Sequence, residues 1–140
     1  MTTLLIVEDD FLIREMMDIT LSQAGYSVVT ASSGASALEV LRRLRVDLVL
    51  LDIHMPEMSG LDVLKAMRRA GVAMPPVLMV TANTSAEAVK EAMRLGCVGY
   101  VAKPFAPEGL LARVRRVLKP AQPGSLARRE AAPVARVLEI

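Results

Sequence analysis

The stretch Val46-Asp47-Leu48-Val49-Leu50-Leu51-Asp52 combines a short apolar run with an acid at its end. A run this short and this apolar is typical of a strand that is covered on both faces of a sheet. Four similar runs lie at residues 4–7, 26–31, 77–80 and 98–102. The sequence therefore predicts five buried strands.

Amphipathic stretches separate these strands. Apolar residues at helical spacing mark two of them, one formed by Ala37, Leu38, Leu41 and Leu44 and the other by Leu110, Leu111, Val114, Val117 and Leu118. The stretch Thr84-Ser85-Ala86-Glu87 resembles a capping box that opens a further helix, and Pro107 suits the first turn of the last one. Strict alternation of five strands and five helices predicts an α/β fold, a parallel sheet with helices on both faces and right-handed connections.

Length and composition favour one soluble domain. The chain has 140 residues, of which 53% are hydrophobic, and a net charge of +2. This charge is spread along the chain and aromatic residues make up only 3%, so no direct binding of nucleic acid is expected. The lone Cys97 excludes an intrachain disulfide and is expected to be a small buried hydrophobe.

Neither a signal peptide nor an apolar run near the ~20 residues that span a bilayer is visible, so we expect a cytoplasmic protein without a membrane segment. The pattern changes at Pro120, and Pro123, Gly124 and Pro133 interrupt the last part of the chain. We expect residues 1–119 to form the domain and residues 120–140 a tail or linker that is largely disordered.

Acidic residues follow two of the predicted strands. Glu8 and Asp9 come directly after the first strand, and Asp52 comes directly after the third. In open α/β sheets the ligand site lies outside the carboxyl ends of the strands, so these acids are expected to converge. Several close carboxylates repel one another unless a cation joins them, and Mg²⁺ is the natural ion where a phosphate also binds.

The fourth strand ends in a hydroxyl residue, Thr81, and Lys103 follows the fifth. Acids, a hydroxyl and an ammonium group at one edge of a sheet form a candidate phosphoryl-transfer site. In this interpretation Asp52 is the nucleophile, Lys103 and the metal offset phosphoryl charge, and Thr81 donates a hydrogen bond. Each residue alone also has an ordinary structural explanation, such as a turn acid or a surface lysine, so the hypothesis depends on their combination.

Four segments together resemble the response-regulator receiver family of two-component signalling, over about residues 3–118. They are Leu4-Leu5-Ile6-Val7-Glu8-Asp9-Asp10, Asp52-Ile53-His54-Met55-Pro56-Glu57-Met58-Ser59-Gly60, Val80-Thr81-Ala82 and Gly99-Tyr100-Val101-Ala102-Lys103-Pro104-Phe105. The Asp-x-x-Met-Pro-x-Met-x-Gly motif in the second segment is quite specific. The resemblance implies a flavodoxin-like, doubly wound (βα)5 fold with strand order 2-1-3-4-5.

The resemblance also implies a role for each site residue. Asp52 would be the phosphorylated aspartate. The metal, Mg²⁺ or Mn²⁺, would be held by Asp9 directly, by Glu8 mainly through water, by Asp52 and by the backbone carbonyl of His54. The side chain of His54, facing Asn83, is a candidate influence on how water reaches the acyl phosphate.

The remaining implied roles concern phosphate binding and switching. Lys103 would bind the phosphate, with a cis Lys103–Pro104 bond that aims it into the site. Thr81 and Tyr100 would form the switch pair. The small Ala82 would leave the pocket open to phosphodonors.

The partner implied upstream is a sensor histidine kinase or a histidine phosphotransfer protein, which would dock on the first helix near Phe11, Leu12 and Arg14. The surface of the fourth helix, fifth strand and fifth helix would control an unknown downstream protein. Val98 and Gly99 replace acids that support dimers in related receivers, so a monomer or weak dimer is expected.

Other interpretations stay open. The receiver acts alone, which we favour, or belongs to a longer regulator or hybrid kinase. It is not expected to be an enzyme beyond its own phosphotransfer and dephosphorylation. An aspartyl-phosphate hydrolase would need an acid where His54 stands, and a nucleotide-binding module would need a glycine-rich loop where Glu8-Asp9-Asp10 stands. The last alternative is a receiver that binds a partner without phosphorylation.

Overall fold

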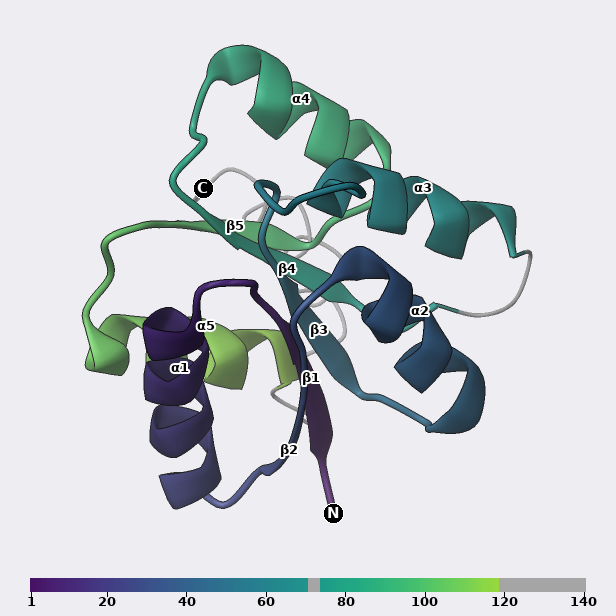
Figure 1. The fold of residues 1–140 in the computed structure, drawn as a ribbon. Coiled ribbons are helices and arrows are strands. Elements are labelled where there is room, and N and C mark those ends of the chain that lie inside the picture. Colours follow the sequence, from purple (N-terminus) through teal and green to yellow (C-terminus); the bar gives the residue numbers. More distant parts are fainter. Residues whose placement is uncertain (71–73, 119–140) are drawn as a thin grey trace, which may run out of the picture.

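The computed structural model describes residues 1–70 and 74–118. The predicted tail at residues 120–140 lies outside these described residues. Figure 1 shows a central sheet with helices on both sides. Strands and helices alternate in the order β1 (Thr3–Val7), α1 (Phe11–Gln23), β2 (Ser27–Ala31), α2 (Gly34–Arg43), β3 (Leu48–Leu51), α3 (Gly60–Arg69), β4 (Val77–Thr81), α4 (Ala86–Arg94), β5 (Gly99–Ala102) and α5 (Pro107–Leu118).

All strand pairs are parallel, and the strand order is β2-β1-β3-β4-β5. This confirms the predicted fold class and strand order. The order reverses between β1 and β3, which both continue into acidic residues. Such a reversal creates a crevice outside the carboxyl ends of the strands, and this is where the candidate site lies.

Two separate apolar cores hold the layers together. One lies between the sheet and α1 and α5, and includes Met17, Leu21 and Leu110. The other lies beneath α2, α3 and α4 and includes Val63 and Met67. Each central strand contributes alternate side chains to both cores, which explains why its sequence is apolar almost throughout.

Side-chain caps set where the helices begin. Ser59 accepts a hydrogen bond from the Asp62 amide, and the Asp62 carboxylate accepts one from the Ser59 amide, so α3 opens with a capping box. The predicted cap of α4 at Thr84 is wrong by one residue. Ser85 is the cap, because its hydroxyl accepts from the Ala88 amide at 3.2 Å.

Strand β3 begins at Leu48, two residues later than the apolar run predicts. Asp47 explains the difference, because its carboxylate accepts a hydrogen bond from the Thr3 amide at 2.8 Å and its own amide donates to the Thr3 carbonyl. Asp47 thus ties the start of β1 to the segment before β3. Within residues 1–70 and 74–118, every helix is too short or too polar to cross a bilayer.

Candidate functional site

Three carboxylates meet at the carboxyl edge of the sheet. Glu8 and Asp9 follow β1, Asp52 follows β3, and one carboxylate oxygen of each lies within 4.8 Å of those of the other two. Glu8 and Asp52 are buried, whereas Asp9 is exposed to solvent. The adjacent, parallel β1 and β3 bring these residues together although they are far apart in the sequence.

Lys103, which follows β5, reaches into this acidic cluster. Its Nζ donates to Asp52 Oδ2 at 2.9 Å and also to Glu8 Oε1. Its backbone amide donates to the Thr81 carbonyl at 3.0 Å, and the Lys103–Pro104 peptide bond is cis. One ammonium group therefore bonds to carboxylates from two different strands.

Burial and pairing shift the pKa values of this pair. Burial raises the pKa of Glu8, and this effect outweighs the hydrogen bond from Lys103. Burial would lower the pKa of Lys103, but its hydrogen bonds to Glu8 and Asp52 outweigh that effect, so the pKa is raised. Lys103 therefore stays charged and supplies the positive charge of the site.

Arg14 anchors the backbone of the acidic loop. Its guanidinium donates to the carbonyl oxygens of Glu8 at 2.9 Å and Asp9 at 3.4 Å, and lies 5.5 Å from the ring centroid of Phe11. Sequence reasoning assigned Arg14 only to partner docking and missed this role. The sequence did contain a hint of this contact, because Arg14 lies in the first turn of α1, only a few residues after Glu8 and Asp9.

The β4–α4 connection links Thr81 to Tyr100 through the backbone of Asn83. The Thr81 hydroxyl accepts a hydrogen bond from the Asn83 amide at 3.2 Å, and the Tyr100 hydroxyl donates to the Asn83 carbonyl. Thr81 and Tyr100 are both buried, and burial raises the pKa of Tyr100 to about 12. The two side chains are therefore joined through one residue rather than by direct contact.

The loop from Asp52 to Gly60 is packed very tightly. A Cβ atom at Gly60 would lie 2.0 Å from the Asp52 carbonyl oxygen, so only glycine fits there. Glu57 adopts a positive φ of 70°, which is unfavourable for a residue with a side chain. The sequence motif contained both residues, but its pattern alone did not reveal this geometry.

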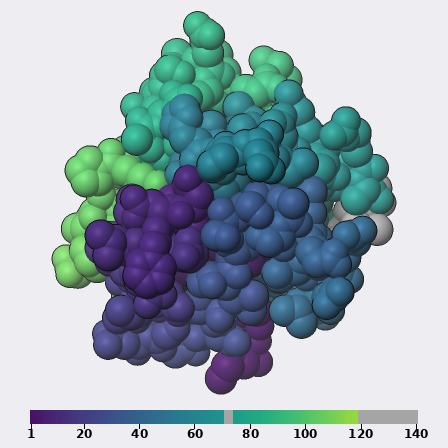
Figure 2. All heavy atoms as spheres, viewed as in Figure 1, coloured from purple at the N-terminus to yellow at the C-terminus, as the bar shows by residue number. Residues whose placement is uncertain are grey.

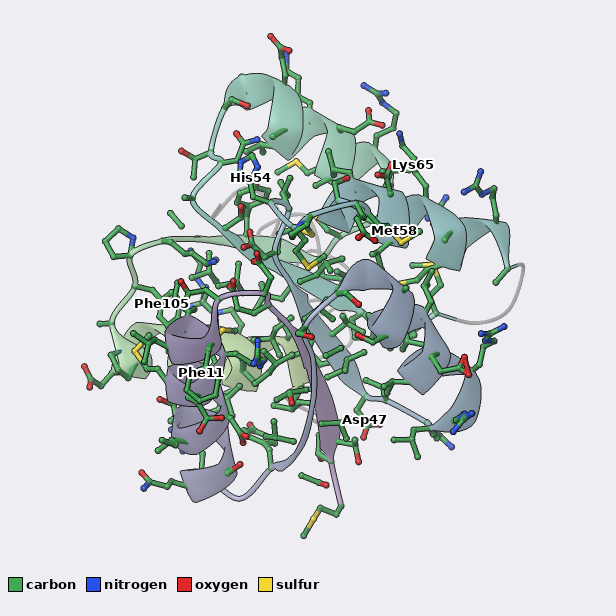
Figure 3. All side chains as sticks on the ribbon, viewed as in Figure 1. Phe11, Asp47, His54, Met58, Lys65 and Phe105 are labelled. Atoms are coloured by element: carbon green, nitrogen blue, oxygen red, sulfur yellow. The ribbon has the colours of Figure 1, made fainter. Side chains whose placement is uncertain are left out.

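His54 and Ala82 are exposed residues next to the buried site residues Asp52 and Thr81. The His54 amide donates to Asp52 Oδ1 at 3.3 Å, and its side chain is exposed. Figure 3 shows this side chain on the loop after β3, below α4. Ala82 is also exposed and follows directly after buried Thr81.

The donor set suits a hard divalent cation. Oxygen ligands from several carboxylates are what Mg²⁺ and Ca²⁺ take in proteins, and a cation would relieve the repulsion among Glu8, Asp9 and Asp52. Lys103 supplies only one positive charge for these three acids. The cluster therefore has both the ligands and the excess negative charge that a metal site needs.

Comparison with known proteins identifies relatives of this arrangement. The family described as response regulator receiver domain matches residues 4–115. The DNA-binding response regulator MtrA of Mycolicibacterium smegmatis is 41% identical over 117 residues, which cover 83% of this chain and 50% of MtrA. The transcriptional regulatory protein TcrX of Mycobacterium tuberculosis is 38% identical over 117 residues, which cover 84% of this chain and 50% of TcrX. The chain thus spans about half the length of these curated relatives.

Solved structures show the same fold. The chemotaxis response regulator CheY4 of Vibrio cholerae is 40% identical, with a TM-score of 0.78, and the match covers 84% of this chain and 99% of CheY4. The response regulator TrrA of Thermotoga maritima, solved in complex with Mg²⁺-BeF, is 31% identical, with a TM-score of 0.75 and coverage of 84% and 100%. These matches agree with the resemblance found in the sequence.

Proposed function

This chain belongs to the response regulator receiver family, and from this premise we propose that Asp52 accepts a phosphoryl group from a histidine kinase or histidine phosphotransfer protein. The observation that carries the proposal is the position of the Asp52 carboxylate. It lies against Lys103 Nζ at 2.9 Å and within 4.8 Å of the Glu8 and Asp9 carboxylates. The proposed nucleophile, a fixed cation and a group of carboxylates that could hold a metal ion therefore lie within one small region.

In the proposed step, a carboxylate oxygen of Asp52 forms a bond to phosphorus as the bond from phosphorus to the donor imidazole nitrogen breaks. The electron pair leaves with that nitrogen. Lys103 offsets charge on the phosphoryl oxygens, and the buried position of Asp52 limits access of water. Mg²⁺ held by Glu8, Asp9, Asp52 and the His54 carbonyl would neutralise further phosphoryl charge.

The signal would leave the site through Thr81. Its hydroxyl, which accepts a hydrogen bond from the Asn83 amide at 3.2 Å, would move toward the phosphoryl group and donate a hydrogen bond to one of the new oxygens. Tyr100, bonded to the carbonyl of the same residue, would respond to that movement. The surface of α4, β5 and α5 would then favour a different partner-binding state.

The upstream partner would dock on α1. Four of the exposed large apolar side chains lie on this helix, namely Phe11, Leu12, Met16 and Ile19. In Figure 2 this helix forms the purple surface beside the blue surface of α2. An apolar stripe of this kind suits a helical partner such as a kinase dimerisation domain, in the cytoplasm.

We propose that the receiver acts through contact with another protein, as a monomer or weak dimer. The half-length match to MtrA, named as a DNA-binding regulator, favours a second arrangement in which this receiver precedes an effector domain. In that arrangement DNA binding would belong to the effector. The encoded sequence beyond Ile140 would distinguish a receiver that acts alone from one that precedes an effector domain.

We do not propose turnover of other substrates, because His54 stands where an aspartyl-phosphate hydrolase would need its acid. The test is incubation of the full chain with acetyl phosphate, with and without Mg²⁺. The receiver function predicts a labile, metal-dependent adduct that Asp52→Asn abolishes. An adduct that survives this substitution contradicts the proposal, and sustained hydrolysis of varied phosphate esters favours a hydrolase.

A further inference from the structure

Asp9 differs from the other two carboxylates of the site in how its side chain is held. Glu8 and Asp52 are buried, and both accept a hydrogen bond from Lys103 Nζ. Asp9 is exposed, and its carboxylate accepts no hydrogen bond from any residue in the described ranges 1–70 and 74–118. One of its oxygens nevertheless lies within 4.8 Å of oxygens of the other two acids. The direction of the Asp9 carboxylate toward the cluster therefore depends mainly on its backbone.

Arg14 holds both peptide groups that flank Asp9. The Glu8 carbonyl belongs to the peptide group before Asp9, and it accepts a hydrogen bond from Arg14 Nη1 at 2.9 Å. The Asp9 carbonyl belongs to the peptide group after it, and it accepts a longer bond from the same nitrogen at 3.4 Å. This second group is also held at its amide end, because the Asp10 amide donates to Glu8 Oε2 at 3.1 Å. Since each peptide group is planar, fixing the two groups fixes φ and ψ of Asp9.

Arg14 is itself held in place by the first turn of α1. Its amide donates to the Asp10 carbonyl at 2.9 Å, and Asp10 caps the helix by accepting a hydrogen bond from the Ile13 amide at 3.0 Å. Its guanidinium carbon lies 5.5 Å from the ring centroid of Phe11, a distance typical of a cation–π contact. Figure 3 shows Phe11 on this helix. The donor that reaches the acidic loop is thus anchored to a capped helix.

We propose that Arg14 is a positioning residue that orients Asp9 for Mg²⁺ and thereby favours Mg²⁺ over Ca²⁺ at this site. The inference rests on the metal site of the proposed function. Mg²⁺ requires near-ideal octahedral geometry at about 2.0–2.1 Å, whereas Ca²⁺ accepts about six to eight oxygens in flexible arrangements at about 2.3–2.6 Å. A carboxylate on a fixed backbone therefore suits Mg²⁺, and movement of that backbone weakens Mg²⁺ binding more than Ca²⁺ binding.

The charge of Arg14 acts in the opposite direction from its geometry. A guanidinium group repels a divalent cation that binds to neighbouring carboxylates, and this repulsion depends on charge and distance rather than on the identity of the ion. If Arg14 acted through charge alone, its removal would tighten the binding of Mg²⁺ and Ca²⁺ by similar factors. If Arg14 positions Asp9, its removal weakens Mg²⁺ binding and changes Ca²⁺ binding less. The sign of the change therefore separates the two roles.

The test is calorimetric titration of the unphosphorylated full chain with Mg²⁺ and, separately, with Ca²⁺. In Arg14→Met the dissociation constant for Mg²⁺ should rise about tenfold, as for other residues that orient metal ligands, and the constant for Ca²⁺ should rise by a clearly smaller factor. Arg14→Lys keeps the charge on a shorter side chain, so it should also lose Mg²⁺ affinity, by a smaller factor than Arg14→Met. Lys65→Met removes an exposed charge on α3 and should change neither constant. Thermal unfolding, recorded first, sets a temperature at which the titrated variants are folded.

Three results for Arg14→Met would overturn the proposal: unchanged Mg²⁺ affinity, tighter binding of both ions, or equal weakening for both ions. If Arg14→Met does not fold, Arg14→Lys decides, and a wild-type Mg²⁺ constant in that variant would overturn the proposal. Failure of the metal site itself gives a different result, because the wild-type protein would then bind neither ion, and the role of Arg14 would fall with it. None of these titrations requires phosphorylation of Asp52.

Discussion

The ammonium group of Lys103 lies 2.9 Å from the carboxylate of Asp52, although 51 positions separate the two residues in the chain. The same ammonium group bonds to Glu8, so it is the fixed counter-charge between two buried acids. An incoming phosphoryl group must share this lysine with Glu8. The unphosphorylated site is therefore held together by the group that would later bind phosphate.

Replacing Lys103 should destabilise the metal-free protein. Lys103→Met leaves Glu8 and Asp52 buried beside each other, so the free energy of unfolding should fall by about 3 kcal/mol, as for other broken buried pairs. Added Mg²⁺ should recover part of this loss, because a divalent ion replaces the missing charge. Urea unfolding with and without Mg²⁺ measures both effects.

Lys65→Met is the matched control, because Lys65 is exposed on α3 and is labelled in Figure 3. It should change stability by less than about 0.5 kcal/mol. Equal losses in the two variants would show that the Lys103 pair contributes no special stability.

Gly60 should tolerate no side chain. In Gly60→Ala the new Cβ would collide with the Asp52 carbonyl oxygen at 2.0 Å, and we expect a loss of about 3 kcal/mol together with loss of phosphorylation. Gly109→Ala is the control, since its Cβ would meet no atom within 4 Å and α5 should gain about 0.5 kcal/mol. Thermal unfolding compares the two, and a neutral Gly60→Ala would contradict the predicted collision.

Glu57 should be a site of backbone strain. Its φ of 70° is costly for a residue with a Cβ, so Glu57→Gly should stabilise the protein by about 1 kcal/mol. Glu57→Ala keeps the Cβ and should gain nothing. Denaturant midpoints of both variants provide the measurement, and equal behaviour of alanine and glycine would exclude strain as the cause.

Stability should fall at alkaline pH, in part because of Cys97. Burial raises the pKa of its thiol from 9.0 to about 11. The unfolded state then loses this proton first, so the stabilising contribution is complete below pH 9 and declines as pH rises toward 11. Cys97→Ala should be less stable at neutral pH by about 1 kcal/mol, and that deficit should shrink across this range. A constant difference between the two proteins would contradict the shifted pKa.

The side chain of His54 should protect the phosphorylated state. This side chain is exposed while the His54 amide donates to Asp52, so substitution leaves that backbone bond in place. His54→Ala should shorten the half-life of phospho-Asp52 severalfold, because water gains access. His54→Gln retains bulk and should have a smaller effect. An unchanged half-life in His54→Ala would end this hypothesis.

The sequence predicted the sheet well because its strands are covered on both faces and so leave a strong apolar pattern. Several boundaries differ from the prediction by one or two residues, and two of these differences have a local explanation. Asp47 satisfies the Thr3 amide and delays β3, and Ser85 competes with the adjacent Thr84 for the same capping role. Patterns of residue type do not resolve choices between neighbours that have similar chemistry.

The geometry inside the site was less predictable. The sequence named Thr81 and Tyr100 as a pair but gave no sign that both bond to the backbone of Asn83. It likewise gave no sign that Arg14 binds the carbonyls of Glu8 and Asp9. These contacts depend on the path of loops, which no periodic pattern encodes.

The contacts of Thr81 and Tyr100 with Asn83 use only its main-chain amide and carbonyl. The side chain makes a separate contact, because Asn83 Oδ1 accepts a hydrogen bond from the Ser85 amide at 3.2 Å. Its replacement would remove that bond but would leave both main-chain contacts available. A small solvent-sensitive dye attached there would follow the connection between β4 and α4 as it moves. The domain thus offers a natural attachment point for an optical biosensor of two-component signalling.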